Sequence, residues 1–131
     1  DNILAGVVLD KAIYTKDGGL SWQTTTLTSP YGVFGDPAVI SDAKGHFYYF
    51  HLADPSKQGR SNEAWLDRIV VQKSTDGGET WSDGESIGHN PPADQDKEWP
   101  AVHPRKQYIY TTWTQFDQYG LTDPTCHSNI M

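Results

Sequence analysis

Aromatic and acidic side chains are mixed in the second half of the chain, and together they suit the binding of a sugar. Aromatic faces stack on sugar rings, and Asp, Glu and Gln oxygens accept hydrogen bonds from sugar hydroxyls. The aromatic residues of interest are Trp65, Trp99, Trp113, Phe116 and Tyr119. Core packing is the competing interpretation. It is favoured for Trp113, whereas both interpretations stay open for Trp65 and Trp99, which we take as candidate ligand-binding residues.

Other residue types in the chain suggest metal or nucleophile chemistry, but their spacing does not support it. The acids that could gather around calcium are Asp94, Asp96, Glu98, Asp117 and Asp123. They lack EF-hand spacing, so we interpret them as a solvated acidic loop and expect no cofactor, with calcium as the alternative. The five His residues show no HExxH-type pairing for zinc. Cys126 is the single cysteine, and we interpret it as a small, partly buried side chain rather than a nucleophile.

A turn that occurs twice must help to position these residues. Residues 15–22 read TKDGGLSW and residues 74–81 read STDGGETW, with their Asp residues 59 positions apart. An Asp in a tight turn accepts backbone hydrogen bonds, two Gly residues supply positive φ, and the Trp anchors the hairpin. We assign a structural role to Thr15, Asp17, Gly18, Gly19, Ser21, Trp22, Ser74, Asp76, Gly77, Gly78, Thr80 and Trp81. The alternative for each Asp is a calcium ligand or a catalytic acid, but one carboxylate supplies too few oxygens for calcium.

The repeat extends to the strands around the turns. Pro37-Ala38-Val39 recurs as Pro100-Ala101-Val102 at an offset of 63, and 47–50 matches 109–112 at an offset of 62. The segments that enter the turns, 12–15 and 69–74, are rich in β-branched or aromatic residues, as strands are. A period near 60 with about four short strands per unit favours propeller blades over a solenoid.

We therefore predict an all-β fold, a β-propeller of four-stranded antiparallel blades, of which the chain holds about two to two and a half. Residues 1–29 form the outer part of one blade, 30–93 a complete blade and 94–131 the start of the next. Strands are expected near 38–41, 47–52, 69–74, just after Trp81, near 101–103 and near 109–115, and a third strand of the last blade from Ser128. Segment 61–68 is expected to be a loop. Closed propellers have about four to eight blades, so we expect the chain to be part of a longer protein that supplies the remaining blades.

Composition narrows the class of function. The net charge is −7, which disfavours electrostatic capture of nucleic acid. No apolar run reaches the length of a membrane-spanning helix, and no long amphipathic helical period is present. Together with the family resemblance described next, this composition leads us to expect a secreted, periplasmic or cell-surface protein.

The element Ser74-Thr75-Asp76-Gly77-Gly78-Glu79-Thr80-Trp81 resembles the Asp box, also called the bacterial neuraminidase repeat, of sialidases and other Asp-box propellers. The resemblance covers nearly the whole chain, and the two Asp boxes are its most specific part. In sialidases an Arg-Ile-Pro-Ala segment opens a blade, and a later loop carries the general acid. Segment 34–38 stands in the first place and segment 62–67 in the second. The resemblance therefore implies Glu63, or else Asp67, as a catalytic general acid.

The chain departs from the sialidase pattern where the substrate carboxylate would bind. Sialidases hold this group with three arginines, and the first of these positions aligns with Gly35, or with Asp36 if the alignment slips by one. A guanidinium binds a carboxylate through two hydrogen bonds, whereas Asp36 would repel it. The chain contains only Arg60, Arg68 and Arg105, none in the matching place. We expect Asp36 to contact a different ligand.

Two functions remain open at this point. The first is a fragment of a secreted glycan-active propeller that binds a carbohydrate or glycoconjugate, either as a glycoside hydrolase with an altered site or without catalysis. The second is a noncatalytic scaffold that binds another protein. Whether the protein is an enzyme stays open, and this fragment alone is not expected to be active. A self-contained domain of 131 residues is disfavoured, because its sheet edges would be open.

Overall fold

The computed structural model describes residues 2–6, 9–61 and 64–131, and within these ranges the fold is all-β. The strands are β1 (Ile3–Gly6), β2 (Lys11–Thr15), β3 (Gln23–Thr26), β4 (Gly35–Ser41), β5 (Phe47–Leu52), β6 (Ile69–Ser74), β7 (Glu85–Ile87), β8 (Asp94–Val102), β9 (Ile109–Phe116) and β10 (Ser128–Ile130). The helical structure in these ranges is one short 3-10 turn, η1 (Gly59–Ser61).

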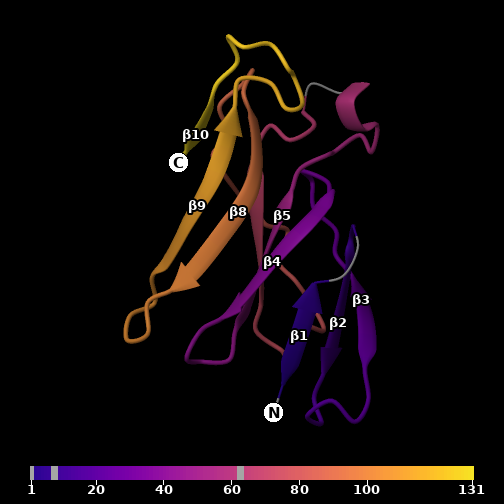
Figure 1. The fold of residues 1–131 in the computed structure, drawn as a ribbon. Coiled ribbons are helices and arrows are strands. Elements are labelled where there is room, and N and C mark those ends of the chain that lie inside the picture. The colour runs from indigo at the N-terminus through magenta and orange to yellow at the C-terminus, as the bar shows by residue number, and fades with distance from the viewer. Residues whose placement is uncertain (1, 7–8, 62–63) are drawn as a thin grey trace.

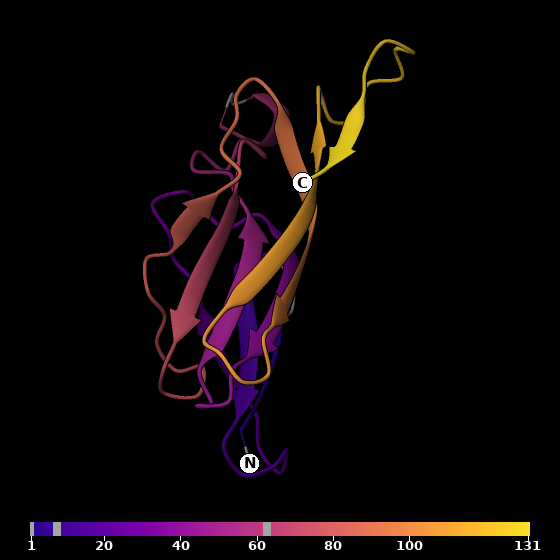
Figure 2. The ribbon, with the colours of Figure 1, turned by 90° about the vertical axis from the view of Figure 1, so that its left-hand side faces the viewer.

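The strands form three antiparallel sheets, and none of them closes on itself. The first sheet has the order β1-β2-β3, the second β4-β5-β6-β7 and the third β8-β9-β10. Every strand thus pairs with its neighbour in the sequence, as in a series of hairpins. Strands β4 and β8, the first of their sheets, lie next to each other, and β1 packs near β4. Figures 1 and 2 show that β4 and β8 start at the end of the molecule opposite the N-terminus.

Apolar side chains hold the sheets together in two clusters. Between the second and third sheets, Phe50, Leu52 and Ile69 are buried, and Ile109 and Trp113 of the third sheet pack against them. Between the first and second sheets, Ala12, Leu27 and Tyr49 form the other cluster. Strand β5 supplies both clusters because it is covered on both faces, which explains its nearly continuous apolar sequence.

The strands that open the second and third sheets carry a bulge at matching places. The pairing of β4 with β5 shifts between Gly35 and Ala38, and the pairing of β8 with β9 shifts between Asp96 and Trp99. One extra residue is inserted at each shift, which bends the strand and re-aims its side chains. Asp36 and Lys97, which follow the start of each shift, have φ of 49° and 59°, in the left-handed region.

The all-β prediction is confirmed, and so are the strands predicted at 47–52, 69–74 and from Ser128. Three details were wrong. Strand β8 begins at Asp94 rather than near Ala101, so the predicted acidic loop is largely strand. Strand β7 begins at Glu85 rather than directly after Trp81. The strand pairings make Ala38 equivalent to Trp99, an offset of 61 rather than 63.

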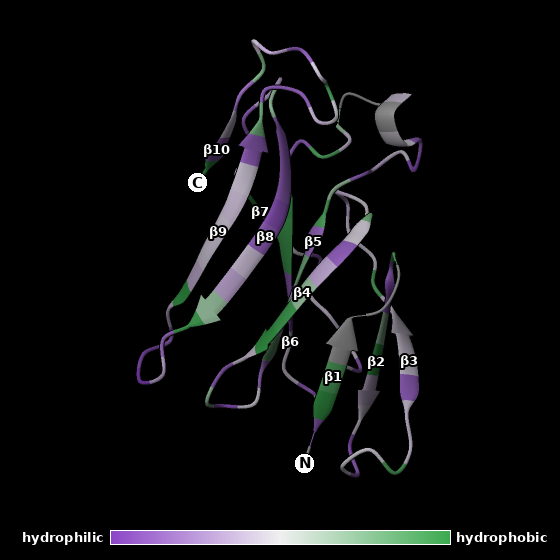
Figure 3. Ribbon diagram, viewed as in Figure 1, coloured by the Kyte–Doolittle hydropathy of each residue, from purple (hydrophilic) through white to green (hydrophobic). Residues whose placement is uncertain are grey.

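Figure 3 shows the consequence for β8: its first half is hydrophilic, while the second half of β4 beside it is apolar. Residues 94–98 read DQDKE, which is an unusual sequence for a strand inside a stack of sheets. No helix in the described ranges has the length and apolar character needed to span a bilayer.

Candidate ligand-binding site

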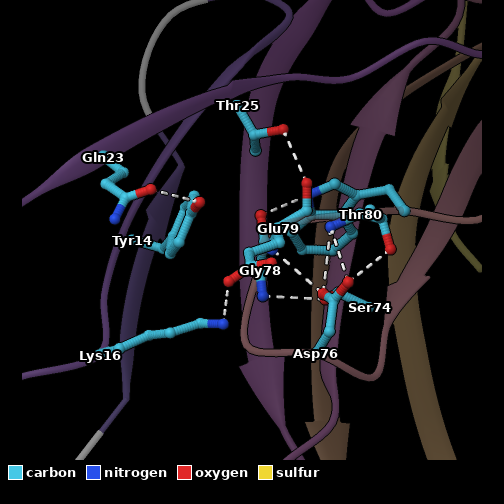
Figure 4. A network of polar contacts seen from close by, with 10 residues as sticks. Tyr14, Lys16, Gln23, Thr25, Ser74, Asp76, Gly78, Glu79 and Thr80 are labelled. Carbon is cyan, nitrogen blue, oxygen red and sulfur yellow. Dashed lines mark hydrogen bonds and ion pairs between the residues drawn. The ribbon is translucent and has the colours of Figure 1, made fainter.

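The second Asp-Gly-Gly turn uses its carboxylate entirely for its own structure (Figure 4). Ser74 Oγ donates to Asp76 Oδ1 at 2.8 Å, and Thr80 donates to the same carboxylate through its amide and its hydroxyl. Burial works in the opposite direction and is the largest single influence, yet the bonds from Thr80, Ser74 and Glu79 together lower the pKa of Asp76 to about 2. Asp76 is therefore an ionised acceptor that ties the turn together.

The first turn repeats this pattern. Ser21 donates to Asp17 through its hydroxyl at 2.6 Å and its amide at 2.9 Å, and Thr15 Oγ1 donates at 2.7 Å. These bonds lower the pKa of Asp17. Each turn lies between the last two strands of its sheet, at the end of the molecule away from the starts of β4 and β8.

The two turns differ in their surroundings. In the second turn Trp81 packs edge-on against Tyr49, with ring centroids 5.7 Å apart, and its indole N–H donates to Gly78 O. Glu79 pairs with Lys16 and accepts a hydrogen bond from Thr25, both in or beside the first sheet. In the first turn Trp22 is 46% exposed, so the prediction of a Trp anchor under each hairpin is met in the second turn and not in the first.

A polar cluster forms at the opposite end, where the bulges of β4 and β8 meet. Lys97 Nζ lies 3.0 Å from Asp36 Oδ2 on the neighbouring sheet and 3.3 Å from Asp96 Oδ2. The hydrogen bond to Asp36 raises the pKa of Lys97, and Asp96 adds to the rise. Because Asp36 and Lys97 occupy equivalent positions, this ion pair joins two repeats through their bulges. We call Asp36, Asp96, Lys97 and Glu98 the bulge cluster.

Glu98 is the unusual member of the bulge cluster. Its side chain is 4% exposed, and neither carboxylate oxygen has a hydrogen-bond partner among the described residues. Burial raises the pKa of Glu98 to about 8, and the carboxylates of Asp96 and Asp36 add to the rise. A buried polar group without a partner is costly, so such a group in a stable fold calls for an explanation.

A groove runs beside the bulge cluster between the two sheets. Its volume is about 230 Å³, and it is lined by Pro37, Ala38, Val39, Ile40, Trp99 and Pro100. Trp99 is 75% exposed, the most exposed Trp in the chain. The groove thus joins an open aromatic ring to charged groups within three residues of it in the sequence, as a sugar-binding site requires.

A larger hollow of about 530 Å³ lies at the loop that follows β9, and it does not have this character. Its lining includes Phe116, Tyr119, Cys126 and His127. His127 lies 3.4 Å from Asp117, and its amide donates to the same carboxylate. The hollow is open to solvent and its acidic side chain serves the loop itself, so we place the candidate site at the groove.

Several of the sequence-predicted site residues do not join the bulge cluster. Trp65 packs edge-on against Phe34 and Tyr119, which is the core-packing alternative. Asp67 is buried and bound by Arg68 through two hydrogen bonds of 2.8 and 2.6 Å, and His89 lies 3.3 Å away. Protonating Asp67 would break this ion pair, so it is a poor general acid. Glu63 lies outside the described residues.

The predicted solvated acidic loop was wrong in part, because its central members are buried. Asp96 is 1% exposed and Glu98 is 4% exposed. Asp94 accepts from the Tyr119 amide, while Asp117 and Asp123 cap turns in the loop after β9. Across the part of the chain that the structure describes, no group of three or more His, Cys, Asp or Glu side chains is placed to hold a metal ion.

Sequence reasoning found Asp36 and Trp99 but missed Lys97 and the role of Glu98. The available signal was the repeat itself, because at an offset of 61 a charged residue stands at the same bulge in both units. The 63-residue match of Pro-Ala-Val hid this equivalence. Comparisons with known protein families, curated proteins and solved structures give no match to this chain.

Proposed function

We propose that the chain is part of a secreted sialidase-like Asp-box β-propeller that binds an uncharged carbohydrate at the groove beside the bulge cluster. The three sheets support the propeller, since they follow one another along the chain and their first strands lie side by side. In this arrangement each sheet is a blade, and β4 and β8 are the innermost strands of their blades.

One observation carries the ligand assignment: the Asp36–Lys97 ion pair and the exposed Trp99 border the same groove. Carboxylate and ammonium groups bond sugar hydroxyls as acceptor and donor, and an indole face stacks on a pyranose ring. Both bulge residues hold left-handed backbone angles that cost about 1 kcal/mol each for a residue with a side chain. Such strain is frequent at binding sites.

The same geometry argues against sialic acid as the ligand. Gly35 has φ of 125°, a conformation that an Arg side chain would rarely accept, so the first triad position is closed to arginine. Arg68 is held by Asp67, and Arg105 lies in the loop between β8 and β9 at the other end of the sheets. Asp36 and Asp96 at the groove would repel a carboxylate.

A glycan array with the full-length protein, followed by calorimetric titration of the glycans that bind, tests this proposal. Trp99→Ala should weaken binding at least tenfold. Trp22→Ala is the matched control, because Trp22 is also exposed but lies in the first turn at the other end, and it should leave affinity unchanged.

A fluorogenic sialoside assay completes the test. Rapid release of sialic acid would contradict an uncharged ligand. An array with no binding glycan, combined with saturable binding of a protein partner that Trp99→Ala abolishes, would favour the scaffold function instead.

A further inference from the structure

The search for a further activity starts from Glu98, because burial without a partner needs a reason. The charged groups that act on Glu98 are Asp96 and Lys97 on its own strand and Asp36 on β4. The single ammonium of Lys97 is already shared between the two aspartates. Ionised Glu98 would add a negative charge that no cation in the bulge cluster balances, so the carboxyl keeps its proton at neutral pH.

Asp36 is in the opposite state. Its side chain is 58% exposed and paired with Lys97, so it is an ionised carboxylate in contact with water. Two carboxyl groups in one cluster, one holding a proton in a buried place and the other ionised at the surface, form the arrangement that glycoside hydrolysis uses. The positive φ of Asp36 and its bond to Lys97 fix the direction of its side chain.

We propose that Glu98 is the proton donor and Asp36 the general base for hydrolysis of an uncharged glycoside bound in the groove. This step rests on the proposed function, since the groove must first bind a sugar. Trp99 stacks on the ring, and Lys97 is a positioning residue that holds Asp36.

The chemistry balances within these groups and one water molecule. Glu98 gives its proton to the glycosidic oxygen as the bond from that oxygen to the anomeric carbon breaks. Asp36 takes a proton from water while the water oxygen bonds the anomeric carbon from the other face. The products are a free sugar and an alcohol, and exchange with solvent returns the proton from Asp36 to Glu98. A single displacement of this kind inverts the anomeric centre.

The test uses the full-length protein and two sets of probes, the 4-nitrophenyl and 2,4-dinitrophenyl β-glycosides of glucose, galactose and N-acetylglucosamine. Dinitrophenolate leaves without help from a proton, whereas the 4-nitrophenyl group benefits from one. Glu98→Gln should therefore lower the rate with the 4-nitrophenyl substrate by about 10²-fold or more and change the dinitrophenyl rate little. Asp36→Asn should lower both rates to a similar extent. Glu79→Gln, the same substitution at the other end of the molecule, is the control and should change neither.

The outcomes separate this inference from the proposed function. Glycosides that bind, as measured by Trp fluorescence, but are not hydrolysed would overturn the proton transfer and leave sugar binding intact. Glycosides that neither bind nor react would remove both proposals. Retention of configuration in the first-formed sugar, measured by proton NMR, would overturn Asp36 as a base acting on water. An equal loss with both leaving groups in Glu98→Gln would show that Glu98 only supports the fold.

Discussion

The two ends of this molecule both concentrate carboxylates in strained backbone, yet they use them in opposite ways. At the turn end, Asp17 and Asp76 accept several short hydrogen bonds each from their own turns. At the bulge end, Glu98 has no hydrogen-bond partner in the described part of the chain. The turn end lowers the pKa of Asp76 to about 2, and the bulge end raises the pKa of Glu98 to about 8.

The difference teaches which carboxylates serve the fold. A carboxylate that lowers the free energy of its own turn is a structural group, and changing it or its frame should cost stability without touching a ligand. A carboxyl that is buried at a cost to stability is a candidate for function, and replacing it should preserve or raise stability. The sign of the stability change therefore separates the two ends.

The largest expected effect is at the turn end, in the variant Gly78→Ala. Gly78 has φ of +100°, and an added Cβ would lie 2.5 Å from Leu4 Cδ1 and 3.1 Å from Tyr14 Cβ on the first sheet. Backbone strain and overpacking should together lower the free energy of unfolding by about 3 kcal/mol. Urea denaturation measures this change.

Gly19→Ala is the matched control, because Gly19 is the equivalent residue of the first turn. Its φ is +96°, but the nearest atom to an added Cβ is in Trp22, 3.8 Å away. This variant should lose only the backbone part, about 1 kcal/mol. Equal losses in the two variants would show that the second turn does not dock on the first sheet as described.

At the bulge end, Glu98→Gln should stabilise the protein at high pH. The pKa of Glu98 in the folded protein is about 8, against an ordinary value of 4.5. Between these pH values the folded state binds more protons at this group than the unfolded state, so the contribution of Glu98 to stability falls as pH rises. Glutamine is neutral throughout, and the variant should be more stable than the wild type by about 2 kcal/mol at pH 8.

Thermal or urea unfolding at pH 4.5 and pH 8 measures this effect, and the two proteins should differ little at pH 4.5. Asp76 provides the contrast, because its lowered pKa makes its contribution disappear as pH falls below about 4 toward 2. A stability difference between Glu98→Gln and the wild type that is independent of pH would mean that Glu98 is already ionised in the folded protein.

The turns were predictable because their physics is local. Asp, the two Gly residues and the flanking hydroxyls act within eight residues, so the hydrogen bonds of Asp76 could be deduced from the sequence. The bulge cluster was not predictable in this way. Its residues come from two sheets, and their register depends on the pairing of β4 with β5 and of β8 with β9.

Burial explains the remaining error. A run such as Asp94–Glu98 predicts a solvated loop from residue type alone, because charged groups are rarely buried without a partner. In the fold, the neighbouring sheet covers Asp96 and Glu98, and the bulge sends Lys97 across to Asp36. Only the three-dimensional arrangement shows that one ammonium serves two carboxylates and leaves a third without a partner.

The left-handed backbone of Asp36 gives a smaller effect, seen by comparing Asp36→Ala with Asp36→Gly. Both variants lose the exposed ion pair with Lys97, but only Ala keeps the cost of a positive φ. Asp36→Gly should therefore be the more stable of the two by about 1 kcal/mol in urea unfolding. Both should lose ligand binding. Equal stabilities would show that the bulge relaxes and that Asp36 is not strained.

The smallest effect should come from the ion pair between Lys16 and Glu79 at the turn end. Both side chains are nearly half exposed, at 44% and 46%, so water and salt screen the attraction. In a double-mutant cycle, Lys16→Ala, Glu79→Ala and the double variant should show no measurable coupling in urea unfolding, even at low salt. The docking of the second turn on the first sheet would then depend on the contacts of Gly78 with Leu4 and Tyr14, the same contacts that Gly78→Ala tests. A strong coupling that disappears in high salt would instead place this ion pair among the interactions that join the two sheets.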